Sequence, residues 1–163
     1  MAPTPTAATL PTLGGEYEAI MIIGEVRSID RVREILVSAR TIAVLGASIH
    51  EERPAHYVPE YLHQRGYRII PVNPLHRGMT GWGEPYRATL GELTEQIDIV
   101  DVFRHPGFLP GHLADFLGMQ PAPKVVWFQL GIRNDEVAAK LIAAGIEVVQ
   151  DRCTLADHRR LVP

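Results

Sequence analysis

Five short apolar runs recur along the chain, and they constrain the fold more than any other feature of the sequence. They are 41–46 (TIAVLG), 67–73 (YRIIPVN), 98–103 (DIVDVF), 124–129 (KVVWFQ) and 146–150 (IEVVQ). Their apolar residues follow one another without alternating with polar ones, which is typical of strands buried on both faces of a parallel sheet. Parallel neighbours need long crossover connections, so helices are expected between these runs.

Helical patterns do occupy the intervals. We predict helices over 55–66, over 88–97, over the part of 106–119 that follows its prolines, and over 135–145. Gly66 follows the first of them as a stop signal. Its Pro59 is tolerable only if it falls in the first turn, because proline lacks an N–H group. Asn134 is suited to cap the last helix.

A further helix is predicted before the first strand. Ser28 or Asp30 can cap it, and the apolar residues of 30–40 share one face. The glycine-rich stretch 77–86 indicates a loop with a short edge strand. The predicted fold class is therefore α/β, with a single doubly wound, mostly parallel, Rossmann-like sheet of about five to six strands and an N-terminal helix.

The chain of 163 residues is long enough for one domain with a sizeable core. We assign this domain to residues 21–163. Residues 1–20 are rich in Pro, Thr and Ala, and we expect either a disordered tail or an over-long start, with Met21 as the alternative start. No second-domain linker or internal repeat is visible.

Charge and cysteine content exclude several classes of function. A net charge of −3 and a pI near 6.1 favour neither nucleic acid nor an anionic membrane. No apolar stretch is long enough to span a bilayer. Cys153 is the single cysteine, so neither an internal disulfide nor a multi-thiolate metal site is possible. We expect a cytoplasmic protein with no bound metal.

Ligands of doubly wound sheets bind outside the carboxyl ends of the strands. After the first run, Gly46 permits a tight turn, Ser48 offers a hydroxyl, and Arg53 offers a charge with bidentate geometry. A nicotinamide dinucleotide fingerprint would place glycine where Ser48 and Glu51 stand. These residues favour an anion as ligand, although Ser48 as a turn cap and Arg53 as a surface charge are comparably good interpretations.

The end of the second run argues against a nicotinamide dinucleotide. Such sites usually place an acidic residue about 20 positions after the glycine turn to bind the ribose. Here the strand ends in Asn73 and Pro74. Arg77 could meet a further phosphate, but a surface arginine is the better interpretation. Arg104, at the end of the third run, needs solvent or an anion, and Gln129 could reach the same cleft from the fourth.

The catalytic signals are weak. Cys153 follows Arg152, which would lower a thiol pKa, but adjacent residues of an extended segment point apart. A structural, partly buried cysteine is therefore a better interpretation than a nucleophile. The histidines are scattered, and no set with metal-ligand spacing or Ser-His-Asp arrangement is visible. We predict no catalytic residues.

Five motifs in order resemble one family. They are VLGAS followed by an arginine, GYRIIPVNP, DIVDVFR, VWFQLGIRN and DRC. Together, over about residues 30–161, they resemble the small stand-alone CoA-binding domain proteins (the YccU-like family). These share a Rossmann-type module with the N-terminal domain of succinyl-CoA synthetase α-chains. The further synthetase domain that carries the phosphorylated histidine has no counterpart here.

The resemblance implies that coenzyme A, or a related adenine nucleotide, binds in the cleft. The implied binding residues are Gly46, Ala47 and Ser48 at the diphosphate, Val72, Asn73 and Pro74 along the adenosine, and Phe103 and Arg104 on the adjoining wall. Arg53 is added on the basis of its charge.

Binding without catalysis is the leading hypothesis. An NAD(H)-binding redox enzyme or sensor, a thiol enzyme that uses Cys153, and an interaction protein with a vestigial cleft are the alternatives. The sequence leaves open the protein partner, if any, and the oligomeric state.

Overall fold

The apolar runs form a five-stranded parallel sheet in the computed structural model, which describes residues 24–163. The strand order is β2 (Arg68–Val72), β1 (Thr41–Leu45), β5 (Ile99–Val102), β6 (Val125–Phe128) and β7 (Glu147–Val149), and every neighbouring pair is parallel. The prediction of a doubly wound sheet is confirmed. Residues 1–20, predicted to be a tail or an over-long start, lie outside the described residues.

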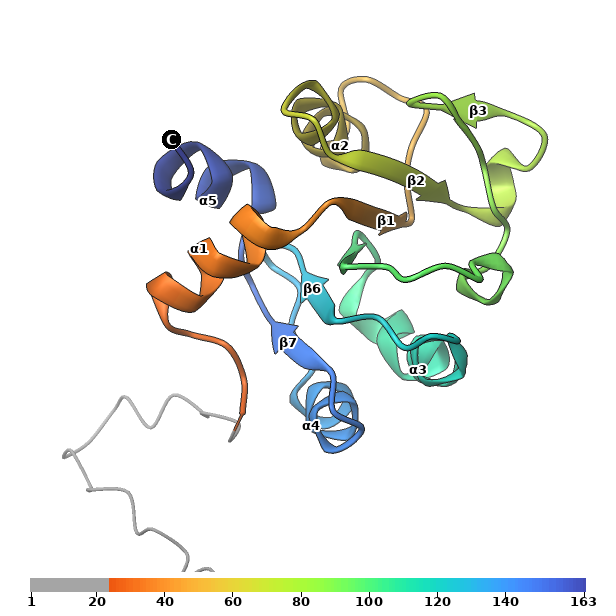
Figure 1. Ribbon diagram of the computed structural model, residues 1–163. Coiled ribbons are helices and arrows are strands. Elements are labelled where there is room, and N and C mark those ends of the chain that lie inside the picture. Colours follow the sequence, from red (N-terminus) through yellow and green to blue (C-terminus); the bar gives the residue numbers. More distant parts are fainter. Residues whose placement is uncertain (1–23) are drawn as a thin grey trace, which may run out of the picture.

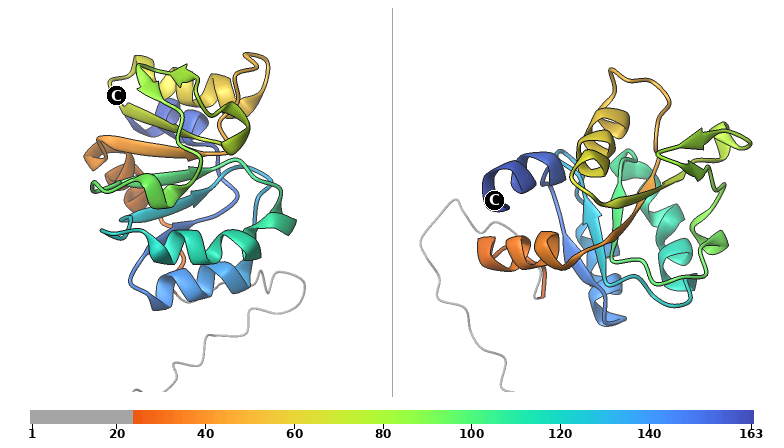
Figure 2. Two further views of the ribbon diagram at one scale, coloured as in Figure 1. Left: turned by 90° about the vertical axis from the view of Figure 1, so that its right-hand side faces the viewer. Right: turned by 45° about the horizontal axis from the view of Figure 1, so that its top comes forward.

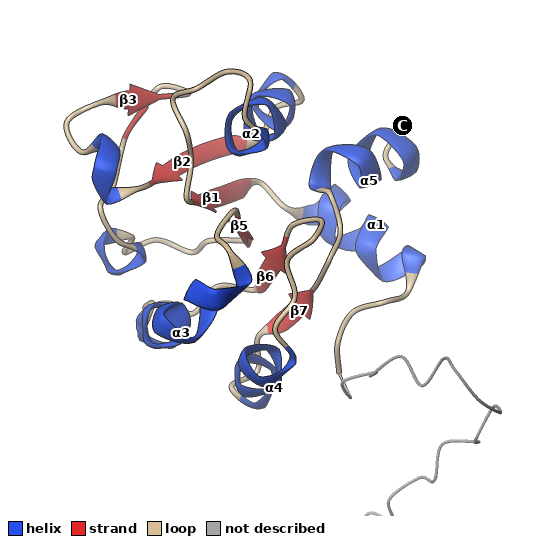
Figure 3. Ribbon diagram, turned by 180° about the vertical axis from the view of Figure 1, so that it is seen from behind, coloured by secondary structure: helices blue, strands red, loops and turns tan. Residues whose placement is uncertain are grey.

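Helices cover both faces of the sheet (Figures 1 and 3). One face carries α1 (Ile29–Ser38), α2 (Pro54–Gln64) and α5 (Thr154–Leu161), and the other carries α3 (Leu109–Gly118) and α4 (Asp135–Ala143). The left view of Figure 2 shows the strands between these two layers. Two separate apolar cores result.

The side chains of successive strand residues point to opposite faces of the sheet, so they pack into opposite cores. In β1, Ala43 and Leu45 pack under α3 and α4, whereas Ile42 and Val44 pack under α1 and α2. All four are at most 5% exposed. This double burial explains why the strands lack polar alternation.

The helix termini follow the expected capping chemistry. Ser28 caps α1 by accepting a hydrogen bond from the Arg31 N–H, and Asn134 caps α4 by accepting one from the Val137 N–H at 2.9 Å. Both caps agree with the predictions. Gly66, at φ 96°, follows the end of α2 as expected.

Two helix predictions need correction. The prediction of a helix over 88–97 is wrong, because only a 3-10 turn, Leu90–Glu92, forms there. Gly91 disfavours a longer helix, and the carboxylate of Glu92 accepts the N–H of Ala88. Pro59 lies in the interior of α2 rather than in its first turn, because the helix already begins at Pro54.

Two features extend beyond the predicted elements. Helix α5 was not predicted, since no element was assigned after residue 150. The glycine-rich stretch forms a separate two-stranded sheet of β3 (Thr80–Gly81) and β4 (Glu84–Pro85), where a short edge strand was expected. Within the described residues, no helix is both long enough and apolar enough to cross a membrane.

The strand order reverses direction between β1 and β5, and this switch point leaves a crevice at their carboxyl ends. Gly46 follows β1 there, with φ 87° and its N–H bonded to the Val72 carbonyl at 2.9 Å. A Cβ atom on Gly46 would lie 2.5 Å from the carbonyl oxygen of Phe103, which follows β5. Gly46 therefore lets the two loops meet.

We predict that Gly46→Ala destabilises the protein far more than Gly78→Ala. Both positions have φ near 90°, so both substitutions carry the left-handed strain of about 1–2 kcal/mol. Only Gly46 also faces a backbone clash, since a Cβ on Gly78 meets nothing within 4 Å. Overpacking adds roughly 1–3 kcal/mol. Urea unfolding of both variants measures the difference, and equal losses would contradict the close approach at Gly46.

Candidate functional site

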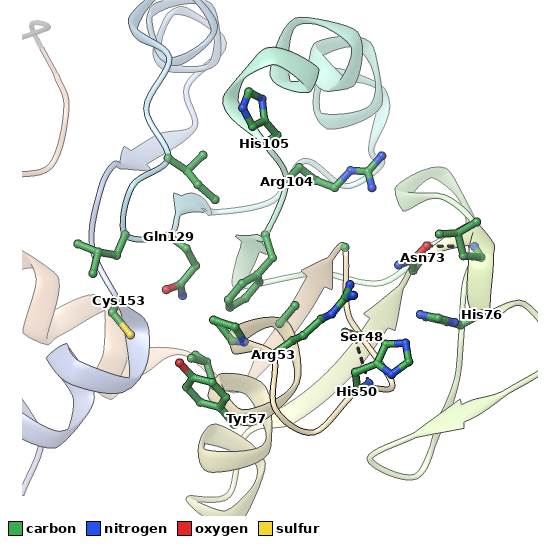
Figure 4. A pocket seen from close by; sticks show the side chains of 18 residues that line it. Ser48, His50, Arg53, Tyr57, Asn73, His76, Arg104, His105, Gln129 and Cys153 are labelled. Atoms are coloured by element: carbon green, nitrogen blue, oxygen red, sulfur yellow. Dashed lines mark hydrogen bonds between the residues drawn. The ribbon is translucent and has the colours of Figure 1, made fainter.

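A pocket of about 660 Å³ lies at the carboxyl ends of β1, β2, β5 and β6 (Figure 4). This size is typical of small-molecule sites. Its walls come from the loops after these strands, from the start of α2 and from the start of α5. Its lining residues are Gly46, Ser48, His50, Arg53, Pro54, Ala55, Tyr57, Val58, Asn73, Leu75, His76, Phe103, Arg104, His105, Gln129, Leu130, Ile132 and Cys153.

The loop between β1 and α2 is held by its own polar groups. Pro59 has no N–H to offer the carbonyl of Ala55 four residues earlier, and that carbonyl accepts the N–H of Ser48 at 3.2 Å instead. Ser48 Oγ accepts the N–H of His50 at 3.1 Å. The His56 ring bonds the Ser48 carbonyl at 2.8 Å. Ser48 therefore caps the turn, and its hydroxyl hydrogen has no acceptor among residues 24–163.

Asn73 joins the loops after β1 and β2. Its Nδ2 donates to the carbonyl of Ala47 at 3.0 Å, and its Oδ1 accepts the N–H of Leu75 at 3.0 Å. The second bond caps the 3-10 turn Pro74–His76. Because both polar atoms are engaged within the protein, Asn73 supports the wall of the pocket in this structure.

Two arginines line the pocket, and none of the described residues that line it is acidic. Arg53 and Arg104 both line it, and neither forms an ion pair with a carboxylate within the described residues. Arg104 donates from Nε to His112 at 3.3 Å and lies over the ring of Phe108. In Figure 4 the guanidinium group of Arg53 lies near the middle of the pocket, whereas that of Arg104 lies farther out, in the upper right of the view. Unpaired arginines in a cleft without acids are suited to an anion.

A buried polar network lies beside the pocket. Asp101 is fully buried in β5, where the other residues are apolar. Gln129 Nε2 donates to Asp101 Oδ1 at 2.8 Å, and the hydroxyl of Thr154 donates to Asp101 Oδ2 at 3.0 Å. Burial raises the pKa of the Asp101 carboxyl to about 7, although these two hydrogen bonds oppose the rise. The network connects β5 and β6 to the first residue of α5.

The structure brings most of the predicted site residues together. Gly46, Ser48, Arg53, Asn73, Phe103 and Arg104 line the pocket. Val72 and Pro74 line a smaller adjoining cavity of about 160 Å³. Ala47 is fully buried and contributes its carbonyl to Asn73. The roles of all nine residues toward a ligand stay predictions.

Other lining residues were not predicted. Tyr57, Leu75, His76 and Leu130 come from a helix and loops whose course sequence patterns do not specify. Asp101 and Thr154 were also missed, although an acid inside an apolar run is a visible signal of a buried polar contact. Gln129, for which the sequence left a place at the cleft open, lines the pocket.

Cys153 lies at the pocket, directly before α5. Its side chain is partly buried. The neighbouring Arg152 is directed to Asp157, with both hydrogen bonds shorter than 2.9 Å, and not to the thiol. Across residues 24–163 there is no group of three or more His, Cys, Asp or Glu side chains that could hold a metal ion.

Fold and pocket together define an α/β protein of the doubly wound, Rossmann-like class with a positively charged cleft at its switch point. Comparison with known proteins defines the family. The model of the CoA binding domain family matches residues 40–159. The chain belongs to this family, and membership supports coenzyme A binding in general.

Individual relatives agree with this assignment. The uncharacterized protein YneT of Bacillus subtilis (strain 168) is 38% identical over 127 residues, covering 78% of this chain and 91% of YneT. The structure of cell-free ID.343 from Thermus thermophilus is 47% identical with a TM-score of 0.79, and covers 83% of this chain and 99% of that one. A hypothetical protein from Pyrococcus horikoshii OT3 is 32% identical, with a TM-score of 0.76 and coverage of 84% and 94%.

The buried carboxyl of Asp101 predicts a specific dependence of stability on pH. Its pKa is about 7 in the folded protein and about 3.9 in an unfolded chain. Between these values the folded state binds the proton more strongly, so this group's contribution to the free energy of unfolding falls as pH rises from about 4 to about 7. Asp101→Asn removes the titration.

The measurement is urea unfolding of the wild type and Asp101→Asn at a series of pH values. The stability of the variant relative to the wild type is expected to rise between about pH 4 and pH 7 and to be constant above. A difference that does not change with pH would show that Asp101 keeps an ordinary pKa in the folded protein.

Proposed function

We propose that this protein binds coenzyme A, or a CoA-like adenine nucleotide, in the pocket at the carboxyl ends of the parallel strands, without catalysing a reaction of its own. The observation that carries this proposal is the presence of both Arg53 and Arg104 in a pocket that no acidic residue of the described part of the chain lines. Coenzyme A has three phosphate groups, and guanidinium groups bind phosphate in bidentate geometry.

The position of the pocket supports the same ligand. It lies at the switch point between β1 and β5, where doubly wound sheets bind nucleotides. The loop after β1 presents Gly46 and the hydroxyl of Ser48 to the pocket, and the start of α2 adds the positive end of a helix dipole. Apolar side chains at the rim, such as Leu75 and Leu130, are exposed and available to cover an adenine ring or a hydrocarbon chain.

The end of β2 makes an NAD(H)-binding redox enzyme the weaker hypothesis. The residue that would bind the adenosine ribose in such enzymes is acidic, and here the position holds Asn73. Its carboxamide is already bonded to Ala47 and Leu75. Among residues 24–163 no carboxylate lines the pocket, so the ribose hydroxyls of NAD would lack their usual partner there.

Absence of catalysis is supported by the surroundings of the candidate groups. The histidines that line the pocket have no acidic partner there. His105 uses Nδ1 to accept the N–H of Gly107 at 3.0 Å, and the His76 ring packs edge-on against Tyr86. Such contacts support structural functions for the rings of His76 and His105. We therefore assign binding and no chemical step.

The ligand class can be tested by thermal unfolding with added nucleotides. A ligand that binds only the folded state at about 100 times its Kd stabilises it by about 2.7 kcal/mol. Coenzyme A is expected to raise the melting temperature by several degrees, whereas NADH at the same concentration leaves it unchanged. A shift with NADH and none with coenzyme A would reverse the assignment.

The role of the arginines predicts the effect of neutral substitutions. Arg53→Met and Arg104→Met are each expected to weaken coenzyme A about tenfold in calorimetric titration, because each removes a charged hydrogen bond to phosphate. Lys140→Met on α4 removes a charge outside the pocket and serves as the matched control. Equal affinity in all three variants and the wild type would place the phosphates elsewhere.

A further inference from the structure

Gln129 presents one polar atom to the pocket, and hydrogen bonds inside the protein fix the orientation of its carboxamide. The residue is only 4% exposed, yet it lines the pocket. Its Nε2 lies 2.8 Å from Asp101 Oδ1 and 2.7 Å from Thr154 Oγ1. Both hydrogens of the amide nitrogen are therefore donated inside the protein. The carbonyl oxygen Oε1 is the side-chain atom that can still accept a hydrogen bond.

The network permits only this orientation of the carboxamide when Asp101 is ionised. The hydroxyl hydrogen of Thr154 is donated to Asp101 Oδ2, so Thr154 Oγ1 must accept from Gln129. A turned-over Gln129 would bring its Oε1 against the carboxylate of Asp101, which also only accepts. Asp101 and Thr154 thus aim the acceptor of Gln129 outward.

The described part of the chain offers this acceptor no donor. Within residues 24–163, Gln129 Oε1 receives no hydrogen bond, and no fully buried side-chain polar atom in this part of the chain is without a partner. Oε1 therefore keeps contact with the pocket. A fixed acceptor in a largely apolar surrounding selects a ligand that carries an N–H or O–H group there.

The surroundings of Gln129 differ from the rest of the pocket. Leu130, Ile132 and Cys153 line the same pocket from neighbouring segments. In Figure 4, Gln129 and Cys153 lie at one side of the view and Asn73 and His76 at the other, with the guanidinium groups of the two arginines between them. The Gln129 side is thus less polar and suits an uncharged chain.

We propose that Gln129 Oε1 accepts a hydrogen bond from the amide-bearing arm of the ligand, and that Asp101 and Thr154 are positioning residues for this contact. The inference rests on the proposed function, since it assumes that coenzyme A occupies the pocket. The pantetheine arm of coenzyme A has two amide N–H groups and one hydroxyl. With the phosphates at Arg53 and Arg104, the arm extends toward Gln129 and Cys153, and the nucleoside toward Asn73.

Calorimetric titration with two ligands tests this assignment at pH 8 under reducing conditions. The ligands are coenzyme A and 3′-phosphoadenosine 5′-diphosphate, which is its nucleotide portion without the arm. Gln129→Met keeps the size of the side chain and removes the acceptor. It is expected to weaken coenzyme A about fivefold and to leave the nucleotide portion unchanged.

Asp101→Asn releases the network with almost no change of shape. The nitrogen of the new amide can donate to Gln129 Oε1, so a turned-over Gln129 is no longer excluded and its carboxamide loses its fixed orientation. The expected loss for coenzyme A is smaller than in Gln129→Met, because the acceptor is still present in part of the molecules. Gln64→Met, on the exposed part of α2, is the matched control and should match the wild type.

The outcomes separate the inference from the proposed function. A loss confined to coenzyme A supports the assignment of Gln129. Unchanged coenzyme A binding in both variants, or equal losses for both ligands, would overturn it, because equal losses indicate a structural role. Wild-type protein that binds the nucleotide portion as tightly as coenzyme A overturns the inference and leaves the proposed function intact. Wild-type protein that binds neither ligand overturns both.

Discussion

Burial of the parallel sheet on both faces is the constraint on which the rest of this structure depends. A strand such as β1 contributes alternate side chains to two cores, so almost none of its residues can be polar. Polar groups are therefore concentrated where the strands end. Because parallel strands end at the same edge, Gly46, Asn73, Arg104 and Gln129 gather around one pocket. The location of the candidate site is thus a consequence of the fold.

Asp101 is the informative exception to this rule. A carboxyl group in the middle of a buried strand is costly, and the raised pKa expresses that cost. The structure compensates with donors from Gln129 and Thr154, which connect the sheet to α5. The same donors leave a single acceptor of Gln129 facing the pocket. A position that is unfavourable for stability thereby gives the pocket a defined polar group, as is common at functional sites.

Much of the fold was predictable because its signals are local. Unbroken apolar runs indicate buried strands, and the rule for parallel sheets places ligands at their ends, which identified Gly46, Asn73 and Arg104 from sequence. The errors have non-local causes. The carboxylate of Glu92 replaces helical bonding around 88–97, and the buried environment of Thr154 at the start of α5 comes from Asp101, far away in sequence. The hydrogen bonds of Asn73 depend on how two loops meet, which no local pattern records.

The most direct test of the account is a crystal structure of this protein grown with coenzyme A. Electron density for one molecule is expected in the pocket, with phosphates against Arg53 and Arg104 and the arm toward Gln129. Density for coenzyme A at another surface, with this pocket empty of ligand, would contradict the central claim that the switch-point cleft is the binding site.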